Sequence, residues 1–382
     1  MTDVMLIFGT RPEAIKMAPL VHAFKHDEML NAKVCVTAQH REMLDQVLAA
    51  FDIRPDFDLD LMAQGQDLFD VTAQVLLNLR GLLKETKPKL VLVHGDTTTS
   101  MAAATACFYL GIPVGHVEAG LRTHDLAAPF PEEFNRRVTG LLTGLHFAPT
   151  LKSKQNLINE GVNKDCILET GNTVVDALKW ALRRLETDIE LGEAVDNQLD
   201  EFLSFDWKHE TVVLITSHRR ENFGDGFKEI CQAIADLSAK NPGVHFVYPV
   251  HLNPNVQEPV KKILTDKSNV HLIAPLEYLF FVRLMSFSYL VLTDSGGIQE
   301  EAPSIGKPVL VMRDVTERPE AVDAGTVRLV GASRASICDG IQSLLDDPEL
   351  YHRMSHAHNP YGDGQACGRI VKRVKEYISC DK

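Results

Sequence analysis

The stretch "LVLTDSGGIQEEAPSIGKPVLVM", residues 290–312, decides the fold class of this chain. It runs from an apolar segment through a turn with two glycines, Gly296 and Gly297, into a short helical pattern and then a second apolar segment. Strand, helix and strand in this order form the building unit of a parallel sheet. The turn offers backbone N–H groups to an anion such as phosphate. Glu300 and Glu301, which follow within four residues of the turn, therefore need an explanation, because carboxylates repel an anion.

The same alternation continues along nearly the whole chain. Between the apolar runs lie amphipathic stretches such as residues 67–85, where apolar residues recur at helical spacing. We therefore predict an α/β protein with parallel sheets covered by helices on both faces. The expected strands are Val4–Phe8, Lys33–Thr37, Leu90–Val93, Val114–Val117, Val212–Ile215, Val244–Tyr248, Val270–Ile273, Leu290–Leu292 and Val309–Met312.

The length of 382 residues suits two domains. The alternation pauses between about residues 173 and 210, where the sequence is charged and shows no strand pattern. We predict two Rossmann-like, doubly wound lobes, with the boundary in this region. The first lobe comprises residues 1–172 with the C-terminal helix 364–382 packed on it, and the second comprises residues 173–363.

Composition excludes several classes of function. The formal net charge of −13 argues against nonspecific binding to nucleic acid or to an anionic membrane. The first apolar run, Val4–Phe8, is too short for a signal peptide or a membrane span, so we expect a cytoplasmic protein. The seven cysteines are scattered and include no C-x-x-C pair, which fits reduced thiols rather than disulfides or a zinc site.

Polar motifs follow the carboxyl ends of the expected strands, where open parallel sheets bind ligands. Because such motifs occur in both halves of the chain, we expect one active-site cleft between the two lobes. The motifs are "GTRPEAIK" after Phe8, "HGDTTTS" after Val93, "EAGLRTHD" after Val117, "TSHRREN" after Ile215, "PVHLNP" after Tyr248, "TDSGGIQEE" after Leu292 and "RDVTERPEA" after Met312.

The acidic residues of the first half have structural alternatives. Asp96 precedes "TTTS" and is equally well placed to cap the helix that starts there. Glu132 and Glu133 follow Pro131 in what is expected to be the first turn of a helix, where acids are favourable, so local sequence favours a structural role for them. Glu118 directly follows a buried strand, which favours a functional role.

The second half supplies positive groups. His218, Arg219 and Arg220 follow the strand pattern "VVLIT", which favours an anion site over a solvated loop, whereas His251 suits a structural role equally well. Together with Arg318, these residues suit the diphosphate of a nucleotide sugar, because a guanidinium can donate two parallel hydrogen bonds to it. The carboxylates of the first half would then act on the sugar as acids and bases.

Several signatures of other enzymes are missing. The motif "GTRPEA" is not the G-x-G-x-x-G fingerprint of dinucleotide binding, and no G-x-x-x-x-G-K-[ST] phosphate loop occurs. Metal-ligand spacing is also missing among His, Asp and Glu. We therefore expect neither a cofactor nor a metal.

A set of motifs, in order over about residues 4–370, resembles the non-hydrolysing bacterial UDP-N-acetylglucosamine 2-epimerases. The set consists of "GTRPEAIKMAPL", "HGDTTT", "HVEAGLRT", "PFPEEFNRR", "DSGGIQEEAPSIGKPVLVMRDVTERPEAV" and "NPYGDGQA". The resemblance implies a GT-B-like fold with the active site in the interdomain cleft, a homodimer, and UDP-N-acetylglucosamine as both substrate and allosteric activator.

The resemblance also implies the reaction. UDP-N-acetylglucosamine and UDP-N-acetylmannosamine are interconverted at C2 by anti elimination of UDP, through a 2-acetamidoglucal, and re-addition. The product would supply N-acetylmannosamine units for a cell-surface polysaccharide. A GT-B-type glycosyltransferase, a hydrolysing epimerase and a non-catalytic UDP-sugar sensor are the alternatives. Three acids in one lobe favour the epimerase, because an inverting transferase needs chiefly one base.

Residue roles are carried over by motif. The implied catalytic residues are Asp96, Glu118, Glu132 and His218. The resemblance does not assign any of the three carboxylates to a particular face of C2. The implied substrate-binding residues are Arg11, Lys16, Phe281, Ser295, Gly296, Gly297, Glu301 and Arg318. The implied allosteric residues are Gln39, His40 and Arg41, for which a helix start with a solvated face is the alternative.

Two details depart from or refine this pattern. Leu276 and Phe280 stand near the expected uracil site where a Gln and a Pro would be expected, so one uracil contact here would be apolar or come from the backbone. Glu301 is expected to accept hydrogen bonds from the ribose hydroxyls. Glu300 lies about 100° around the helix and is expected to be structural or solvated.

Overall fold

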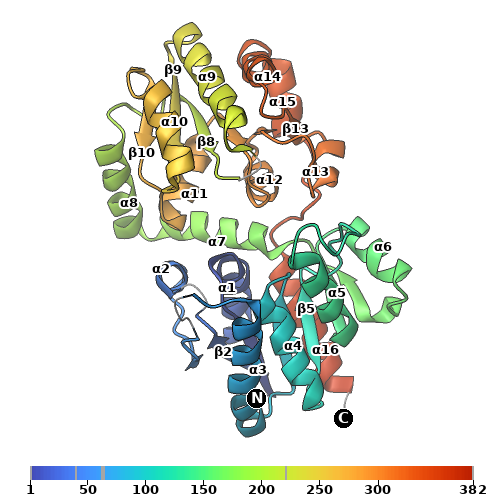
Figure 1. Cartoon of the computed structure of the whole chain (residues 1–382). Coiled ribbons are helices and arrows are strands. Elements are labelled where there is room, and N and C mark those ends of the chain that lie inside the picture. Colours follow the sequence, from blue (N-terminus) through green and yellow to red (C-terminus); the bar gives the residue numbers. More distant parts are fainter. Residues whose placement is uncertain (1, 39–40, 62–64, 220–221, 381–382) are drawn as a thin grey trace. The chain divides into compact units, whose positions relative to one another are not determined.

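The computed structural model describes residues 2–38, 41–61, 65–219 and 222–380 (Figure 1). The chain divides into two compact units. Unit 1 contains residues 1–180 and 361–382, and unit 2 contains residues 181–360. Each unit is built on one parallel sheet with helices on its faces, which confirms the predicted α/β class with two Rossmann-like, doubly wound sheets.

The sheet of unit 1 has seven strands, all parallel to their neighbours. From one edge to the other the strands are β3 (Phe57–Asp58), β2 (Leu30–Val36), β1 (Thr2–Phe8), β4 (Leu90–His94), β5 (Val114–Val117), β6 (Leu145–Ala148) and β7 (Ile167–Glu169). The first six follow the 3-2-1-4-5-6 order of a Rossmann fold. The chain therefore reverses direction across the sheet between β1 and β4, and ligands bind at such a point in this fold.

Helices cover this sheet, and the C-terminal helix joins them. The helices of unit 1 are α1 (Arg11–Lys25), α2 (Arg41–Ala50), α3 (Leu68–Thr86), α4 (Thr98–Tyr109), α5 (Glu132–Leu142), α6 (Leu151–Asn159), the 3-10 helix η1 (Lys164–Cys166) and α16 (Ala366–Cys380). Helix α7 (Thr173–Thr187) begins in unit 1 and continues into unit 2. Figure 1 shows the red α16 among the blue and teal elements, and α16 packs against α1.

The sheet of unit 2 repeats the same order. Its strands are β10 (Val270–Ile273), β9 (Val244–Pro249), β8 (Thr211–Thr216), β11 (Leu290–Thr293), β12 (Val309–Val311) and β13 (Val327–Leu329). The reversal lies between β8 and β11, which are followed by "SHRR" and "DSGG". In both units, therefore, the polar motifs stand at the edge of the sheet where Rossmann folds bind ligands.

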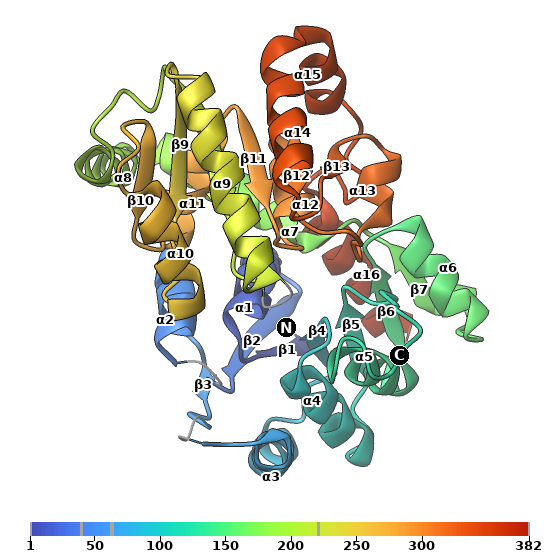
Figure 2. The same ribbon diagram turned by 45° about the horizontal axis from the view of Figure 1, so that its top comes forward.

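Helices also cover the sheet of unit 2. They are α8 (Ile189–Phe202), α9 (Asp225–Lys240), α10 (Pro254–Leu264), α11 (Tyr278–Phe287), α12 (Ile298–Glu301), the 3-10 helix η3 (Ala302–Ile305), α13 (Pro319–Asp323), α14 (Arg334–Asp346) and α15 (Pro348–Ser355). Figure 2 shows α9 between α10 and α14, and α9 contacts both. Apolar residues of α9, α10, α14 and α15 and of the strands form a buried core.

Local sequence explains where elements begin. Asp67 caps α3, accepting the backbone N–H of Asp70, while the Asp70 carboxylate accepts the N–H of Asp67, so the two orphan donors are satisfied reciprocally. The apolar periodicity over residues 67–85 therefore corresponds to a capped helix.

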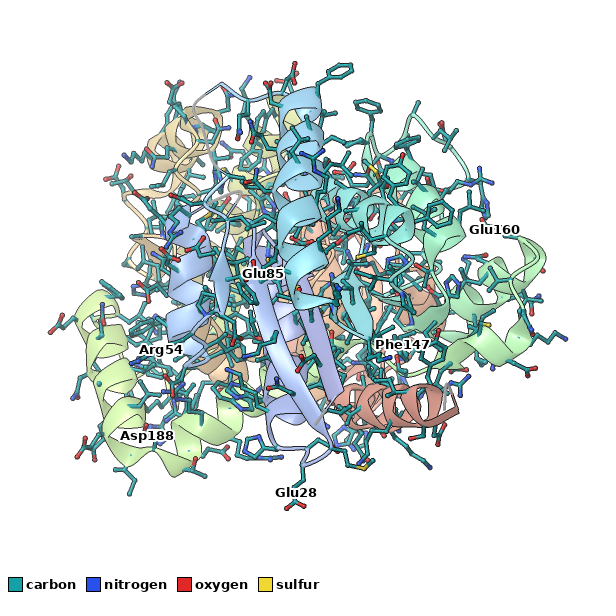
Figure 3. The ribbon with its side chains drawn as sticks, turned by 90° about the horizontal axis from the view of Figure 1, so that it is seen from below. Glu28, Arg54, Glu85, Phe147, Glu160 and Asp188 are labelled. Carbon is teal, nitrogen blue, oxygen red and sulfur yellow. The ribbon has the colours of Figure 1, made fainter. Side chains whose placement is uncertain are left out.

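The interior of unit 1 is apolar. Phe147 of β6 is fully buried. Figure 3 shows Phe147 within the layers of unit 1, whereas Glu28 and Glu160 project from its rim.

Gly120 fixes the path of the chain just after β5. Its φ of +90° is in the left-handed region, and an added Cβ would lie 2.2 Å from the carbonyl oxygen of Ser153. A side chain at this position therefore meets backbone that cannot rotate away.

We predict that Gly120→Ala lowers the free energy of unfolding by more than about 2 kcal/mol, because it combines backbone strain with this contact. Gly161→Ala is the matched control, since Gly161 has a φ of +87° but no atom within 4 Å of an added Cβ. Its cost is expected to be about 1 kcal/mol. Urea denaturation of both variants tests the difference, and equal shifts of the midpoint would contradict the role of the Ser153 contact.

Candidate functional site

The turn between β1 and α1 is fixed by Glu13. Thr10 caps α1, accepting the backbone N–H of Glu13 at 3.4 Å, and Glu13 Oε2 accepts the N–H groups of Gly9 at 3.0 Å and Thr10 at 2.8 Å. This capping box sets the start of the helix that carries Arg11 and Lys16. Arg11, the first helical residue, is half-buried.

The same carboxylate reaches a second loop. Glu13 Oε1 accepts the hydroxyl of Thr97 at 2.5 Å and the hydroxyl of Ser100 at 3.0 Å, both at the start of α4. Glu13 is fully buried, and burial raises its pKa above the usual value, although its hydrogen bonds with Thr97, Gly9 and Thr10 oppose the shift. Glu13 therefore fixes the β1–α1 turn to the loop that carries Asp96.

Asp96 lies in that loop and is paired with a cation. Arg136 of α5 donates to Asp96 Oδ2 at 2.6 Å, and the side-chain amide of Asn135 donates to the Asp96 carbonyl at 2.9 Å. The residue that caps α4 is Thr97, which accepts the backbone N–H of Ser100. The alternative that Asp96 caps this helix is therefore wrong.

Glu118 follows β5 in a strained backbone conformation. Its φ is +63°, a region that residues other than glycine seldom occupy and that recurs at functional sites. Glu118 Oε2 forms an ion pair with Lys16 and accepts the amide of Asn172 at 2.7 Å. His94 Nε2 lies 3.8 Å from the same oxygen. Burial lowers the pKa of His94 to about 4, although Glu118 opposes the shift.

Glu132 and Glu133 begin α5 and differ in their surroundings. Glu133 is fully buried and accepts the backbone N–H groups of Thr123 at 3.0 Å and His124 at 3.3 Å, with Arg136 at 3.4 Å. It thus holds the loop after β5 in place. Glu132 Oε2 is buried without a hydrogen-bond partner among the described residues, which is unusual for a purely structural carboxylate.

In unit 2 the corresponding edge carries His218. The His218 side chain is 45% exposed, and its Nδ1 lies 3.4 Å from Oδ1 of the buried Asp294. Burial lowers the pKa of His218, Asp294 raises it, and Arg219 and His251 lower it further. The rings of His218 and His251 stack at a centroid distance of 5.9 Å.

The glycine turn after β11 packs against Arg318. An added Cβ at Gly296 would lie 3.3 Å from Arg318 Cζ, so a side chain here would press against the guanidinium. The N–H of Ser295 is held by the hydroxyl of Thr293 at 2.9 Å. Arg318 donates to Glu300 Oε1 at 2.7 Å and to Glu317 Oε2 at 2.8 Å.

The two glutamates after the turn therefore differ. Glu300 is fully buried and pairs with Arg318, so it is structural, and the solvated alternative for it is wrong. Glu301 accepts the Tyr278 hydroxyl at 3.4 Å, and an added Cβ at Gly297 would lie 3.8 Å from Glu301 Oε2. Glu301 is thus the acid that borders the turn.

The other residues expected at the site lie in α11, at the start of α2 or outside the described residues. Phe281 is half-buried in α11. Arg41 begins α2 and forms ion pairs with Asp45 and Asp58, which supports the helix-start alternative. Gln39, His40 and Arg220 lie outside the described residues.

Four residues of the site were missed in the sequence: Glu13, Arg136, Asn172 and Asp294. Glu13, Arg136 and Asp294 lie within quoted motifs, whereas Asn172 lies outside them. The contact partner of each is distant along the chain. The described part of the chain holds no group of three His, Cys, Asp or Glu side chains suited to a metal ion. It also contains no helix long and apolar enough to span a bilayer.

Two Rossmann-like units, one with buried carboxylates and one with a glycine turn beside cationic groups, define a GT-B-like protein of the kind that handles nucleotide sugars. The profile of the family described as UDP-N-acetylglucosamine 2-epimerase matches residues 22–375. This chain belongs to that family.

Individual relatives match over almost the full length. UDP-N-acetylglucosamine 2-epimerases of Yersinia pestis and Escherichia coli K12 are each 57% identical, covering 98% and 97% of this chain and 98% of each relative. The crystal structure of UDP-GlcNAc 2-epimerase from Neisseria meningitidis bound to UDP-GlcNAc superposes with a TM-score of 0.90 at 51% identity. That comparison covers 98% of this chain and 100% of the other.

Three buried histidines of unit 1 make its stability depend on pH. Burial lowers the pKa of His94 to about 4, of His116 to about 3 and of His146 to about 4, from an ordinary value of 6.5. The unfolded chain therefore binds more protons than the folded chain below about pH 6.5. The free energy of unfolding is therefore highest above that pH, where the rings are neutral in both states, and it decreases as the pH falls towards 4.

We predict that the free energy of unfolding falls by up to ~1.4 kcal/mol per pH unit for each such histidine in this window. His146→Asn should make the profile shallower than that of the wild-type chain by about one proton. Urea denaturation between pH 7 and 4.5 measures both slopes. Parallel profiles for His146→Asn and the wild-type chain would contradict the assignment.

Proposed function

We propose that this protein interconverts UDP-N-acetylglucosamine and UDP-N-acetylmannosamine by inverting C2. The observation that carries the proposal is the set of three carboxylates, Asp96, Glu118 and Glu132, at the carboxyl edge of the unit 1 sheet. Inversion needs one group that removes the C2 proton and another that returns a proton on the opposite face. A single base would not suffice.

The environments of the three acids suit this task. Glu118 is held by Lys16 and Asn172, and Asp96 by Arg136, so both are fixed in position by charged or amide donors. Glu132 Oε2 has no hydrogen-bond partner among the described residues. We propose that these carboxylates exchange protons with C2 and that Lys16 and Arg11 contact the sugar phosphate.

Unit 2 would hold the UDP moiety. Ser295, Gly296 and Gly297 offer the turn, and Arg318, fixed by Glu300, would face the diphosphate. Glu301 would accept hydrogen bonds from the ribose, and Phe281 would lie near the uracil.

His218 would assist departure of UDP. In the elimination the C2–H and C1–O bonds break, a C1–C2 double bond forms, and UDP leaves with the electron pair of the C1–O bond. Re-addition of UDP to the 2-acetamidoglucal, with protonation at the other face of C2, gives the epimer. The product of the reaction would supply N-acetylmannosamine units for a cell-surface polysaccharide.

NMR of the purified protein with UDP-N-acetylglucosamine tests this function. We expect UDP-N-acetylmannosamine to accumulate until an equilibrium between the two nucleotide sugars is reached. Free N-acetylmannosamine with UDP would instead indicate the hydrolysing class. No reaction until an acceptor is added would indicate a glycosyltransferase, and binding without any turnover would indicate a sensor.

Two isosteric substitutions test the carboxylates. Asp96→Asn and Glu118→Gln should each lower kcat by roughly 10²- to 10⁴-fold, because they remove a proton-transfer group or its charge, while UDP binding changes little. The matched control is Glu85→Gln on the exposed face of α3. Near-normal turnover in both site variants would show that the acid–base assignment is wrong.

We further propose a homodimer formed through unit 1. Helices α3, α4 and α5 lie side by side (Figure 1). Each of them exposes apolar side chains. Monomers seldom expose contiguous apolar patches without a partner. The exposed residues on these helices are Leu68, Phe69, Leu77, Phe108, Tyr109, Phe134 and Leu141.

Phe108→Asp combined with Leu141→Glu should convert the dimer to a monomer, because two charges would have to be buried in the interface. Leu151→Glu, an exposed leucine of α6, is the control. Analytical ultracentrifugation measures the mass. A dimer that persists in the double variant at micromolar concentration would place the interface elsewhere.

We also propose UDP-N-acetylglucosamine as an allosteric activator, with Gln39, His40 and Arg41 as its contacts. The support is the family motif alone, since the ion pairs of Arg41 equally suit a structural role.

A further inference from the structure

Asp294 lies at the carboxyl end of β11 and is completely buried. Its Oδ2 accepts the hydroxyl of Ser217 at 2.8 Å and the backbone N–H groups of His218 and Arg219, each at 2.9 Å. The amide of Asn222 donates to the same oxygen at 3.4 Å. One carboxylate oxygen thus holds residues 217–219 and Asn222.

The other oxygen of Asp294 has a different environment. Oδ1 is buried and has no hydrogen-bond partner among the described residues. Nδ1 of His218 lies 3.4 Å from this oxygen. A buried carboxylate oxygen without a donor is costly, so an N–H directed at Oδ1 would be strongly favoured.

We infer that Asp294 is a positioning residue that holds the His218 ring with Nδ1–H directed at Oδ1, leaving Nε2 as the atom that acts on the nucleotide. The inference rests on the role proposed above for His218. The tautomer of a histidine is set by the hydrogen bond that its other nitrogen makes. Asp294 therefore determines which edge of the ring carries the proton.

This arrangement fits the departure of a diphosphate. A protonated His218 donates from Nδ1 to Asp294 and from Nε2 to the oxygen that leaves C1 with the electron pair of the broken bond. The proton returns to Nε2 when UDP adds again, so none is consumed. Burial, Arg219 and His251 all disfavour the imidazolium, and Asp294 is the group that favours it.

The substitution Asp294→Asn distinguishes this role from a purely structural one. The amide oxygen of the variant can occupy the place of Oδ2 and keep the loop hydrogen bonds. Its NH₂ group then lies at the place of Oδ1 and donates towards Nδ1, which forces the proton of the neutral ring to Nε2. The substitution therefore preserves the loop but inverts the tautomer.

Two measurements test the inference. Long-range ¹H–¹⁵N NMR of the full chain with UDP should show neutral His218 protonated at Nδ1 in the wild type and at Nε2 in Asp294→Asn. The kcat of the variant should fall on the order of 100-fold, with little change in UDP affinity or Tm. In a His218→Ala background, Asp294→Asn should cause almost no further loss, because both act through one group.

Several outcomes would overturn the inference. A neutral wild-type ring protonated at Nε2 would overturn it without any variant, even if Asp294→Asn fails to fold. A kcat for Asp294→Asn within about twofold of wild type would also overturn it, as would independent effects of the two substitutions in the double variant. A wild-type protein that is inactive on UDP-N-acetylglucosamine contradicts the proposed function instead, and the tautomer can still be measured.

Discussion

The buried contact of Lys16 and Asn172 with one oxygen of Glu118 is the interaction on which the site of unit 1 depends. It joins the first helix, the loop after β5 and the segment after β7. Removing either donor would leave a buried carboxylate with less compensation, which is costly. The left-handed backbone of Glu118 persists because these contacts stabilise it.

The two sheets share one strand order. In each of them six neighbouring strands run 3-2-1-4-5-6, so each unit has one reversal point, after β1 and β4 or after β8 and β11. At the first reversal, Glu13 ties together the loops that carry Lys16 and Asp96. At the second, Asp294 does the same for the His218 segment and the glycine turn. Each unit thus uses a buried carboxylate to align two loops.

The fold class could be predicted because central strands are continuous apolar runs. Strands β3, β6, β7 and β13 were missed because they are short and carry Asp58, His146, Glu169 and Arg328. The motif residues were found because they follow strands. Glu13, Asn172 and Asp294 were not, because their partners lie 84, 54 and 76 residues away in the chain and no local pattern marks such pairs.

We propose that carboxylates of unit 1 exchange protons at C2 while unit 2 holds UDP. The decisive measurement is turnover of UDP-N-acetylglucosamine in D₂O, followed by mass spectrometry and proton NMR of the sugar. We expect every molecule of UDP-N-acetylmannosamine formed to carry deuterium at C2, since the departing proton exchanges with solvent at a carboxylate. An epimer that retains its original hydrogen at C2 would contradict it.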